Sequence, residues 1–211
     1  LKGLQQFSVQ AEITEDVLLD SGLTIQDSRS VTASVRRPNR LRVDAVGALG
    51  DRQLFYDGKT MTLMDLSKNL YSTIDVPPEI DAALNHTIKA YNLRAPLADL
   101  IYANAYDYLM EGTRAGFYLG LSKVQGHLCH HLAFRQKDID WQIWIEQGDK
   151  ALPCKIVITN TDDLSQPQYS AVLNWTSLQP PTASALAFTP PTNAHKIGIE
   201  NVAAANTTGA N

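Results

Sequence analysis

An alternation of apolar and polar residues with a period of two runs through most of this 211-residue chain and limits what it can fold into. Residues 7–13 carry it first, and the same pattern returns over residues 25–35 and 41–45. Successive side chains of a strand point to opposite faces, so the pattern predicts strands with one buried face. The chain is therefore expected to be mainly β.

Turn sequences divide the alternating segments into hairpins. Asp57-Gly58 predicts a tight hairpin of type I′, which needs positive φ at both central residues. Ser67-Lys68-Asn69 predicts a second turn, so strands are expected on both sides of it, over residues 59–66 and 70–76. Later in the chain the alternation resumes, and strands are expected over 115–121, 127–135, 141–146, 152–159 and 168–178.

Only the middle of the chain has the period of a helix. After Pro77-Pro78, apolar residues recur at helical spacing from Ile80 to Tyr91, and Pro96 opens a second helical segment. Helices must bury their apolar stripes, and the concave face of a sheet is the available partner. We expect a mainly β (α+β) fold: an open antiparallel half-barrel of about ten or eleven strands, with two or three helices over its concave face. Residues 1–202 are expected to form a single domain and residues 203–211 a frayed tail.

Composition excludes several classes of protein. The net charge of -4 and the pI near 5.7 argue against a nucleic-acid binder, which usually has a basic surface. No apolar run approaches the roughly 18 residues of a membrane-spanning helix. The sequence contains no nucleophile elbow, phosphate-binding loop or dinucleotide motif, so we expect no enzyme and no cofactor. The chain begins with Leu1, and we expect a secreted protein whose signal peptide has been removed.

Three motifs, in order along the chain, resemble those of the periplasmic lipoprotein-carrier family LolA and LolB. They are Arg37-Pro38-Asn39-Arg40-Leu41 (an "RPxxF" junction with Leu41 in place of the aromatic), Asp57-Gly58-Lys59-Thr60 ("DGKT") and Leu186-Ala187-Phe188-Thr189-Pro190-Pro191 ("FxFTPP" with Leu186 in place of the first aromatic). The run from Cys129 to Glu146 is similar to a "CxHLAFRQ…DWQIWIE" run in DUF2092, a group of predicted periplasmic proteins of unknown function.

The resemblance implies a LolA-like, periplasmic protein with an apolar cavity between sheet and helices. In the carriers that cavity holds lipoprotein acyl chains, and the arginine matching Arg37 is linked to opening and closing of the lid. The expected partner is a lipid or an acylated protein. Peripheral contact with the envelope, an N-terminal lipid and the oligomeric state stay open. Side chains expected to line the cavity or form its lid are Phe7, Val9, Ala11, Ile13, Arg37, Met61, Leu63, Ile80, Leu84, Ile88, Leu97, Leu100, Ile101, Phe117 and Leu119.

Each of these assignments has a simpler alternative. The apolar residues can form an ordinary packed core, and Arg37 can be a solvated strand-end arginine beside Arg36. His127, Cys129 and His131 share one face of a strand, an arrangement found in some metal sites, but polar residues on an exposed sheet face are the favoured interpretation. We expect no metal.

The cysteines and tryptophans of the second half leave further alternatives. The expected strand 141–146 lies between Cys129 and Cys154, which puts their Cα atoms about 9–10 Å apart in a flat sheet. We therefore expect free thiols. Trp141 and Trp144 point to opposite faces, so one is expected in the core and the other at a cavity mouth or an interface.

Two non-catalytic functions compete on this basis, and a metal-dependent enzyme at the face of His127, Cys129 and His131 is a third hypothesis. The first is a periplasmic carrier of an apolar ligand, which predicts a continuous cavity under the helices. The second is a non-catalytic protein-interaction or envelope-sensing module, which predicts a closed core with an exposed apolar patch or an ordered oligomer.

Overall fold

The computed structural model describes residues 3–48, 50–93, 95, 97–179 and 181–199. Its strands are β1 (Gln6–Leu18), β2 (Thr24–Arg36), β3 (Arg40–Gly47), β4 (Arg52–Tyr56), β5 (Thr60–Asp65), β6 (Leu70–Asp75), β7 (Ala115–Val124), β8 (His127–Arg135), β9 (Ile139–Glu146), β10 (Pro153–Asn160), β11 (Gln168–Ser177) and β12 (His195–Lys196). Its helices are α1 (Ile80–Tyr91), α2 (Ala98–Ile101), α3 (Ala105–Met110) and the short 3-10 helix η1 (Ser184–Leu186).

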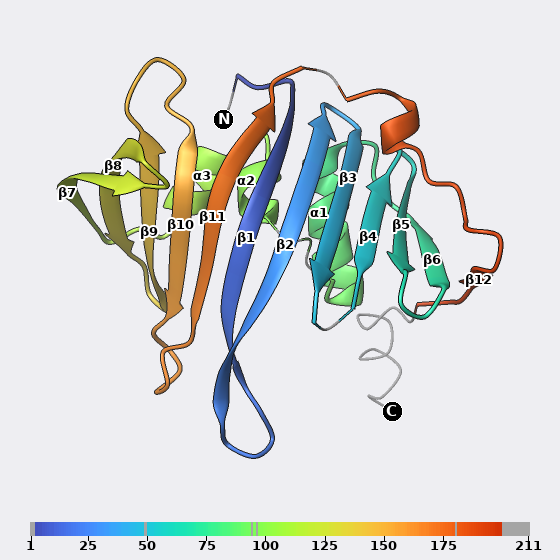
Figure 1. Cartoon of the computed structure of the whole chain (residues 1–211), viewed down its shortest axis with the longest axis horizontal. Coiled ribbons are helices and arrows are strands. Elements are labelled where there is room, and N and C mark those ends of the chain that lie inside the picture. Colours follow the sequence, from blue (N-terminus) through green and yellow to red (C-terminus); the bar gives the residue numbers. More distant parts are fainter. Residues whose placement is uncertain (1–2, 49, 94, 96, 180, 200–211) are drawn as a thin grey trace. The chain divides into compact units, whose positions relative to one another are not determined.

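The expected mainly β fold is confirmed. Within the described residues, twelve strands are hydrogen-bonded in the order β12-β6-β5-β4-β3-β2-β1-β11-β10-β9-β8-β7, and the three α-helices come from the middle of the chain (Figure 1). One more strand is present than expected, because β12 adds a short parallel pair beside β6. Pro96 and the expected tail 203–211 lie outside the described residues.

The chain forms two compact units, which we describe separately. Unit 1 comprises the described parts of residues 1–9, 31–108 and 175–211, and unit 2 comprises residues 10–30 and 109–174. Strands β1, β2 and β11 contribute residues to both units. The expectation of a single domain over residues 1–202 stays a prediction.

In unit 1 the meander β3–β6 is covered on both faces. Met61 pairs with Tyr56 and with Ile74, so these three side chains share one face, and α1 packs there through Thr87, whose hydroxyl lies 3.7 Å from the Met61 sulfur. On the other face the ring of Phe188 lies 5.2 Å from Phe55 and 5.3 Å from Tyr71. Phe188 of the "FxFTPP" segment therefore packs on one face of the meander and α1 packs on the other.

In unit 2 the antiparallel strands β7–β10 have one apolar and one polar face. Trp141 is buried and stacks on Phe134, with ring centroids 4.2 Å apart. On the opposite face His131 stacks on the half-buried Trp144 at 4.0 Å. At the end of this strand order lies β7, where Leu119 falls in a bulge and Gly120 has a φ of +93°. Glycine tolerates that φ because it has no Cβ.

The predicted hairpin at Asp57-Gly58 is present, but its predicted type is wrong. Among the central residues only Gly58 has a positive φ, and three residues separate β4 from β5 instead of two. The Asp57 carboxylate explains the difference, since its Oδ1 accepts hydrogen bonds from the backbone N–H groups of Lys59 (2.9 Å) and Thr60 (2.8 Å). A side chain that caps its own turn makes a left-handed Asp57 unnecessary.

Candidate functional site

A buried arginine links the strands and helices of unit 1. The side chain of Arg37, the residue after β2, is only 7% exposed. Its Nε donates to the carbonyl of Leu4 at 3.1 Å and its Nη2 donates to the carbonyl of Ile101 at 2.6 Å. A guanidinium presents several donors in a fixed plane, so one side chain can hold both backbone segments at once.

Asp81 on α1 completes this arrangement. Its carboxylate lies 3.9 Å from Arg37 Nη1 and accepts the backbone N–H of Ala103, just after α2, at 3.0 Å. Burial lowers the pKa of Arg37 from its usual value, and the nearby Asp81 charge partly opposes that shift. We call this group, consisting of Arg37, Asp81 and the backbone of Leu4, Ile101 and Ala103, the Arg37 latch.

Pro38, the residue after Arg37, also helps to fix where α1 begins. The backbone N–H of Ile80, the first residue of α1, donates to the carbonyl of Pro38 at 3.0 Å. Helix N-termini have N–H groups without partners inside the helix, and the junction after β2 supplies one acceptor. Arg37-Pro38 thus positions both α1 and α2.

The structure buries most of the residues expected to line a cavity. Ile80, Leu84, Leu97, Leu100 and Ile101 are at most 5% exposed, whereas Ile88 is half-buried. On the strands, residues with at most 1% exposure are Phe7, Val9, Ala11, Ile13 and Met61, whereas Leu63 is half-buried. At the contact between Thr87 and Met61 the helix touches the sheet directly, so this part of unit 1 is closed. A role of these residues in ligand binding stays a prediction.

Phe117 and Leu119 differ from the other expected residues. Both lie on β7 in unit 2, and they are 60% and 55% exposed. The expectation that they face a covered cavity does not fit this exposure. Their β7 neighbours Tyr118 and Leu121 are also exposed, at 60% and 47%.

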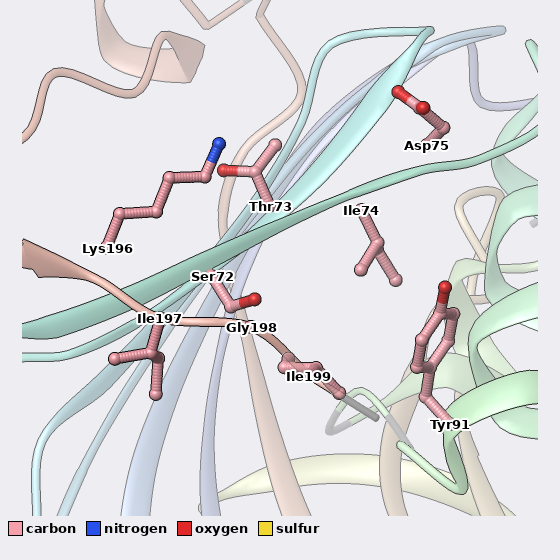
Figure 2. A pocket seen from close by; sticks show the side chains of 9 residues that line it. All are labelled: Ser72, Thr73, Ile74, Asp75, Tyr91, Lys196, Ile197, Gly198 and Ile199. Atoms are coloured by element: carbon pink, nitrogen blue, oxygen red, sulfur yellow. The ribbon is translucent and has the colours of Figure 1, made fainter. Parts of the chain in front are cut away.

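A pocket of about 580 Å³ lies in unit 1 beside β6, the C-terminal end of α1 and the segment after β12. Figure 2 shows its lining side chains, which are Ser72, Thr73, Ile74, Asp75, Tyr91, Lys196, Ile197, Gly198 and Ile199. The pocket forms where the segment after β12 stops pairing with β6. The regular pairing ends at Lys196, and the backbone N–H of Ile197 still donates to the carbonyl of Tyr71 at 2.8 Å.

The chemistry of this pocket is amphipathic. Ile74, Tyr91 and Ile199 lie toward one side together with the Asp75 carboxylate, and Lys196, Thr73 and Ile197 lie toward the other (Figure 2). Ile74 is itself the β6 partner of Met61, so it lies on the same face as the Met61 side chain under α1. The sequence did not predict this pocket, since residues 195–199 show no strand pattern, although the alternation over 70–76 had placed Ile74 in a strand.

The histidines of β8 have separate partners. His127 Nδ1 lies 3.0 Å from the Glu146 carboxylate, and His131 Nε2 lies 3.0 Å from the side-chain oxygen of Gln142. In the described part of the chain, no group of three or more His, Cys, Asp or Glu side chains is arranged to hold a metal ion.

In the structure both cysteines are free thiols, and their side chains lie close together. Their sulfur atoms are 2.9 Å apart, although β9 runs between β8 and β10. The separation expected from strand counting is wrong because it assumed a regular ladder. The register between β9 and β10 shifts between Pro153 and Lys155, which leaves Cys154 in the irregular position.

None of the helices among the described residues is long and apolar enough to cross a membrane.

Comparison with known proteins gives one family and several similar folds. Residues 1–200 match the family described as "Predicted periplasmic protein (DUF2092)". No curated protein matches. Among solved structures, an uncharacterized conserved protein from Thermus thermophilus is 11% identical, with a TM-score of 0.47 and coverage of 90% of each chain.

Two mycobacterial lipoproteins are similar at the same level. LppX from Mycobacterium tuberculosis is 13% identical with a TM-score of 0.49, over 83% of this chain and 88% of that one. LprF from Mycobacterium bovis is 15% identical with a TM-score of 0.49, over 92% and 91%. Identities this low carry no information about a shared ligand.

Proposed function

The chain belongs to the DUF2092 family of predicted periplasmic proteins, and on that premise we propose that it is a non-enzymatic periplasmic binding protein for an apolar ligand, a lipid or an acyl chain. The ligand enters through the pocket beside β6, and its chain extends along the buried face under α1. The Arg37 latch holds the helices over that face when the site is empty.

The pocket is the observation that carries this proposal. It has a volume of about 580 Å³ and is a wide-open surface depression, with room for part of a ligand. Ile74, Tyr91 and Ile199 offer apolar contact, and Lys196 offers a cation for a carboxylate or phosphate head group. An acyl chain gains about 0.8 kcal/mol for each methylene removed from water, so apolar contact alone can supply useful affinity.

The latch supports the idea that the site can open. The apolar side chains under α1 are packed in the described state, so a ligand must separate the helices from the strands to reach them. Arg37 holds the end of α2 through its hydrogen bond to the carbonyl of Ile101. A closed state held by a few hydrogen bonds can exchange with an open state that is only a few kcal/mol higher in free energy.

Binding of a fluorescent fatty acid to the purified protein tests the proposal, after lipid extraction and native mass spectrometry of material purified from cells. Gly198→Trp adds a large ring at a residue that lines the pocket, and nothing lies within 4 Å of a Cβ added there, so the substitution meets no clash. We expect its affinity to fall at least about tenfold. Across saturated fatty acids, each added methylene should tighten binding up to about fourfold until the site is full.

The control is Val46→Trp, which adds the same ring at a position that is 56% exposed on β3, outside the pocket. It should leave affinity unchanged. Equal binding by Gly198→Trp and wild type, or the same affinity for short and long fatty acids, would rule out this site.

A second function is favoured by β7 in unit 2. This strand ends the strand order and exposes Phe117, Tyr118, Leu119 and Leu121. Exposed apolar residues on an edge strand are typical of surfaces that pair with another chain. The alternative is therefore a protein-interaction or envelope-sensing module. It predicts concentration-dependent association in sedimentation experiments that Leu121→Ser weakens, with no fatty-acid binding.

A further inference from the structure

We propose that Cys129 and Cys154 form a structural disulfide in the mature protein, which ties β8 to β10 across the end of β9. The two sulfur atoms lie 2.9 Å apart, less than 1 Å beyond a covalent disulfide of about 2.05 Å. Both cysteines belong to unit 2, so the pair does not depend on how the two units are placed.

The local backbone brings the thiols together. Cys129 pairs with Glu146, the last residue of β9, and the irregular position of Cys154 follows Pro153, which pairs with Ile145. Both thiols also lie near the carbonyl two residues before their own, Cys129 at 3.5 Å from His127 and Cys154 at 3.8 Å from Leu152. The two side chains meet beside the last residues of β9, and the sulfur atoms need to move less than 1 Å closer for a bond to form.

The compartment supplies the oxidant. The bacterial periplasm keeps protein thiols oxidised, and the chemical class required is a protein disulfide of a thiol oxidoreductase. One cysteine thiolate attacks that disulfide and displaces one thiol, and the second cysteine thiolate then attacks the mixed disulfide and displaces the other. One S–S bond forms in this chain, one breaks in the oxidant, and the two protons end on the oxidant's thiols.

The environment of the pair favours a structural over a catalytic disulfide. Cys129 is fully buried. Burial, with a further contribution from the hydrogen bond to Cys129, raises the pKa of Cys154 to about 12. Catalytic disulfides instead contain an exposed thiol of low pKa that leaves easily. Oxidation should be fastest during folding, before burial suppresses the thiolates.

Trapping the thiols tests the inference. The full chain is exported to the periplasm, denatured directly in excess N-ethylmaleimide, and measured by intact mass spectrometry. We expect no adduct, a mass two hydrogen atoms below that of the reduced chain, and a proteolytic fragment that links Cys129 to Cys154. Reductant before trapping should give two adducts. Two adducts without reductant, or a disulfide-linked dimer, would overturn the inference.

Variants separate the disulfide from loss of fold. Cys129→Ser and Cys154→Ser should each yield one adduct. In the wild type, reductant should lower the melting temperature on the order of 5–10 °C, because the bond closes a loop with a sequence separation of 25 residues. The double variant Cys129→Ser/Cys154→Ser should not respond to reductant. These results do not depend on fatty-acid binding, so this inference and the proposed function can fail separately.

Discussion

The two units use the same alternating pattern but cover it differently. In unit 1 both faces of the β3–β6 meander are buried, by α1 on one side and by Phe188 on the other. In unit 2 the strand β7 keeps Phe117, Tyr118 and Leu121 at 47–60% exposure. The difference shows that alternation determines which residues share a face, whereas burial depends on a second layer contributed by another part of the chain.

Residue burial therefore predicts unequal energetic roles for similar side chains. Met61 is fully buried under Thr87 of α1, whereas Leu121 on β7 is 47% exposed. Both are apolar residues on strands, and of the two only Met61 was expected to line the cavity.

The largest expected effect comes from truncating these two side chains. Met61→Ala should lower the free energy of unfolding by about 2–5 kcal/mol, because it leaves a cavity between α1 and β5. Leu121→Ala should cost less than about 1 kcal/mol, because its side chain already faces solvent. Urea denaturation of the purified variants gives both values. Equal losses of unfolding free energy would mean that Leu121 is covered in solution, and would remove the contrast between the units.

The Arg37 latch gives the next effect. Arg37→Ala removes hydrogen bonds from a charged donor to Leu4 and Ile101, so stability should fall by about 2–3 kcal/mol. The same change should tighten fatty-acid binding by up to about 30- to 150-fold, the factor that 2–3 kcal/mol corresponds to, because a less stable closed state raises the fraction of open protein. Thermal unfolding and fluorescence titration measure the two effects on one sample.

Arg37→Lys is the matched variant for this prediction. A lysine keeps the charge but not the planar fork, so it should fall between wild type and Arg37→Ala in both measurements. Arg36→Ala is the control on the neighbouring arginine. If Arg37→Ala loses stability without a gain in affinity, Arg37 has a structural role only.

Much of the fold was predictable because it follows from local patterns. The period of two gave the strands, and the helical spacing after Pro78 gave α1, whose bounds Ile80–Tyr91 match the expected segment. Arg37 was predictable only through the resemblance to the carriers, since a strand-end arginine is usually solvated.

The errors arose where one side chain or one extra residue changes the backbone. The Asp57 carboxylate caps its own turn, so the expected type I′ hairpin became a three-residue connection. The bulge at Cys154 brought two thiols together that a regular ladder would separate. The pocket beside β6 escaped prediction because it depends on pairing between segments over 100 residues apart, Leu70 with His195.

The smallest expected effect is on stability at low pH, where one carboxylate from each unit can be compared. The pKa of Asp57 in unit 1 lies below its ordinary value: burial raises it, but hydrogen bonds from Thr60 and Lys59 and the charge of Arg40 together lower it more. The pKa of Asp140 in unit 2 is also lowered, mainly by the hydrogen bond from Arg135. A carboxyl group whose pKa is lower in the folded state stabilises the protein above its unfolded pKa, near 3.8. That stability is lost as the pH falls through the folded value.

Asp57→Asn and Asp140→Asn should each make unfolding slightly less sensitive to pH between about 5 and 2, which urea denaturation at a series of pH values measures. The effect of salt should then differ between the two carboxylates. Arg135 and Asp140 form an exposed ion pair at 2.7 Å, and 1 M NaCl, with a Debye length of about 3 Å, should screen most of its contribution. The Asp57 contribution comes from short backbone hydrogen bonds inside a turn and should persist in salt. Loss of both effects in salt would instead mean that Asp57 acts through the nearby charge of Arg40, which also lowers its pKa.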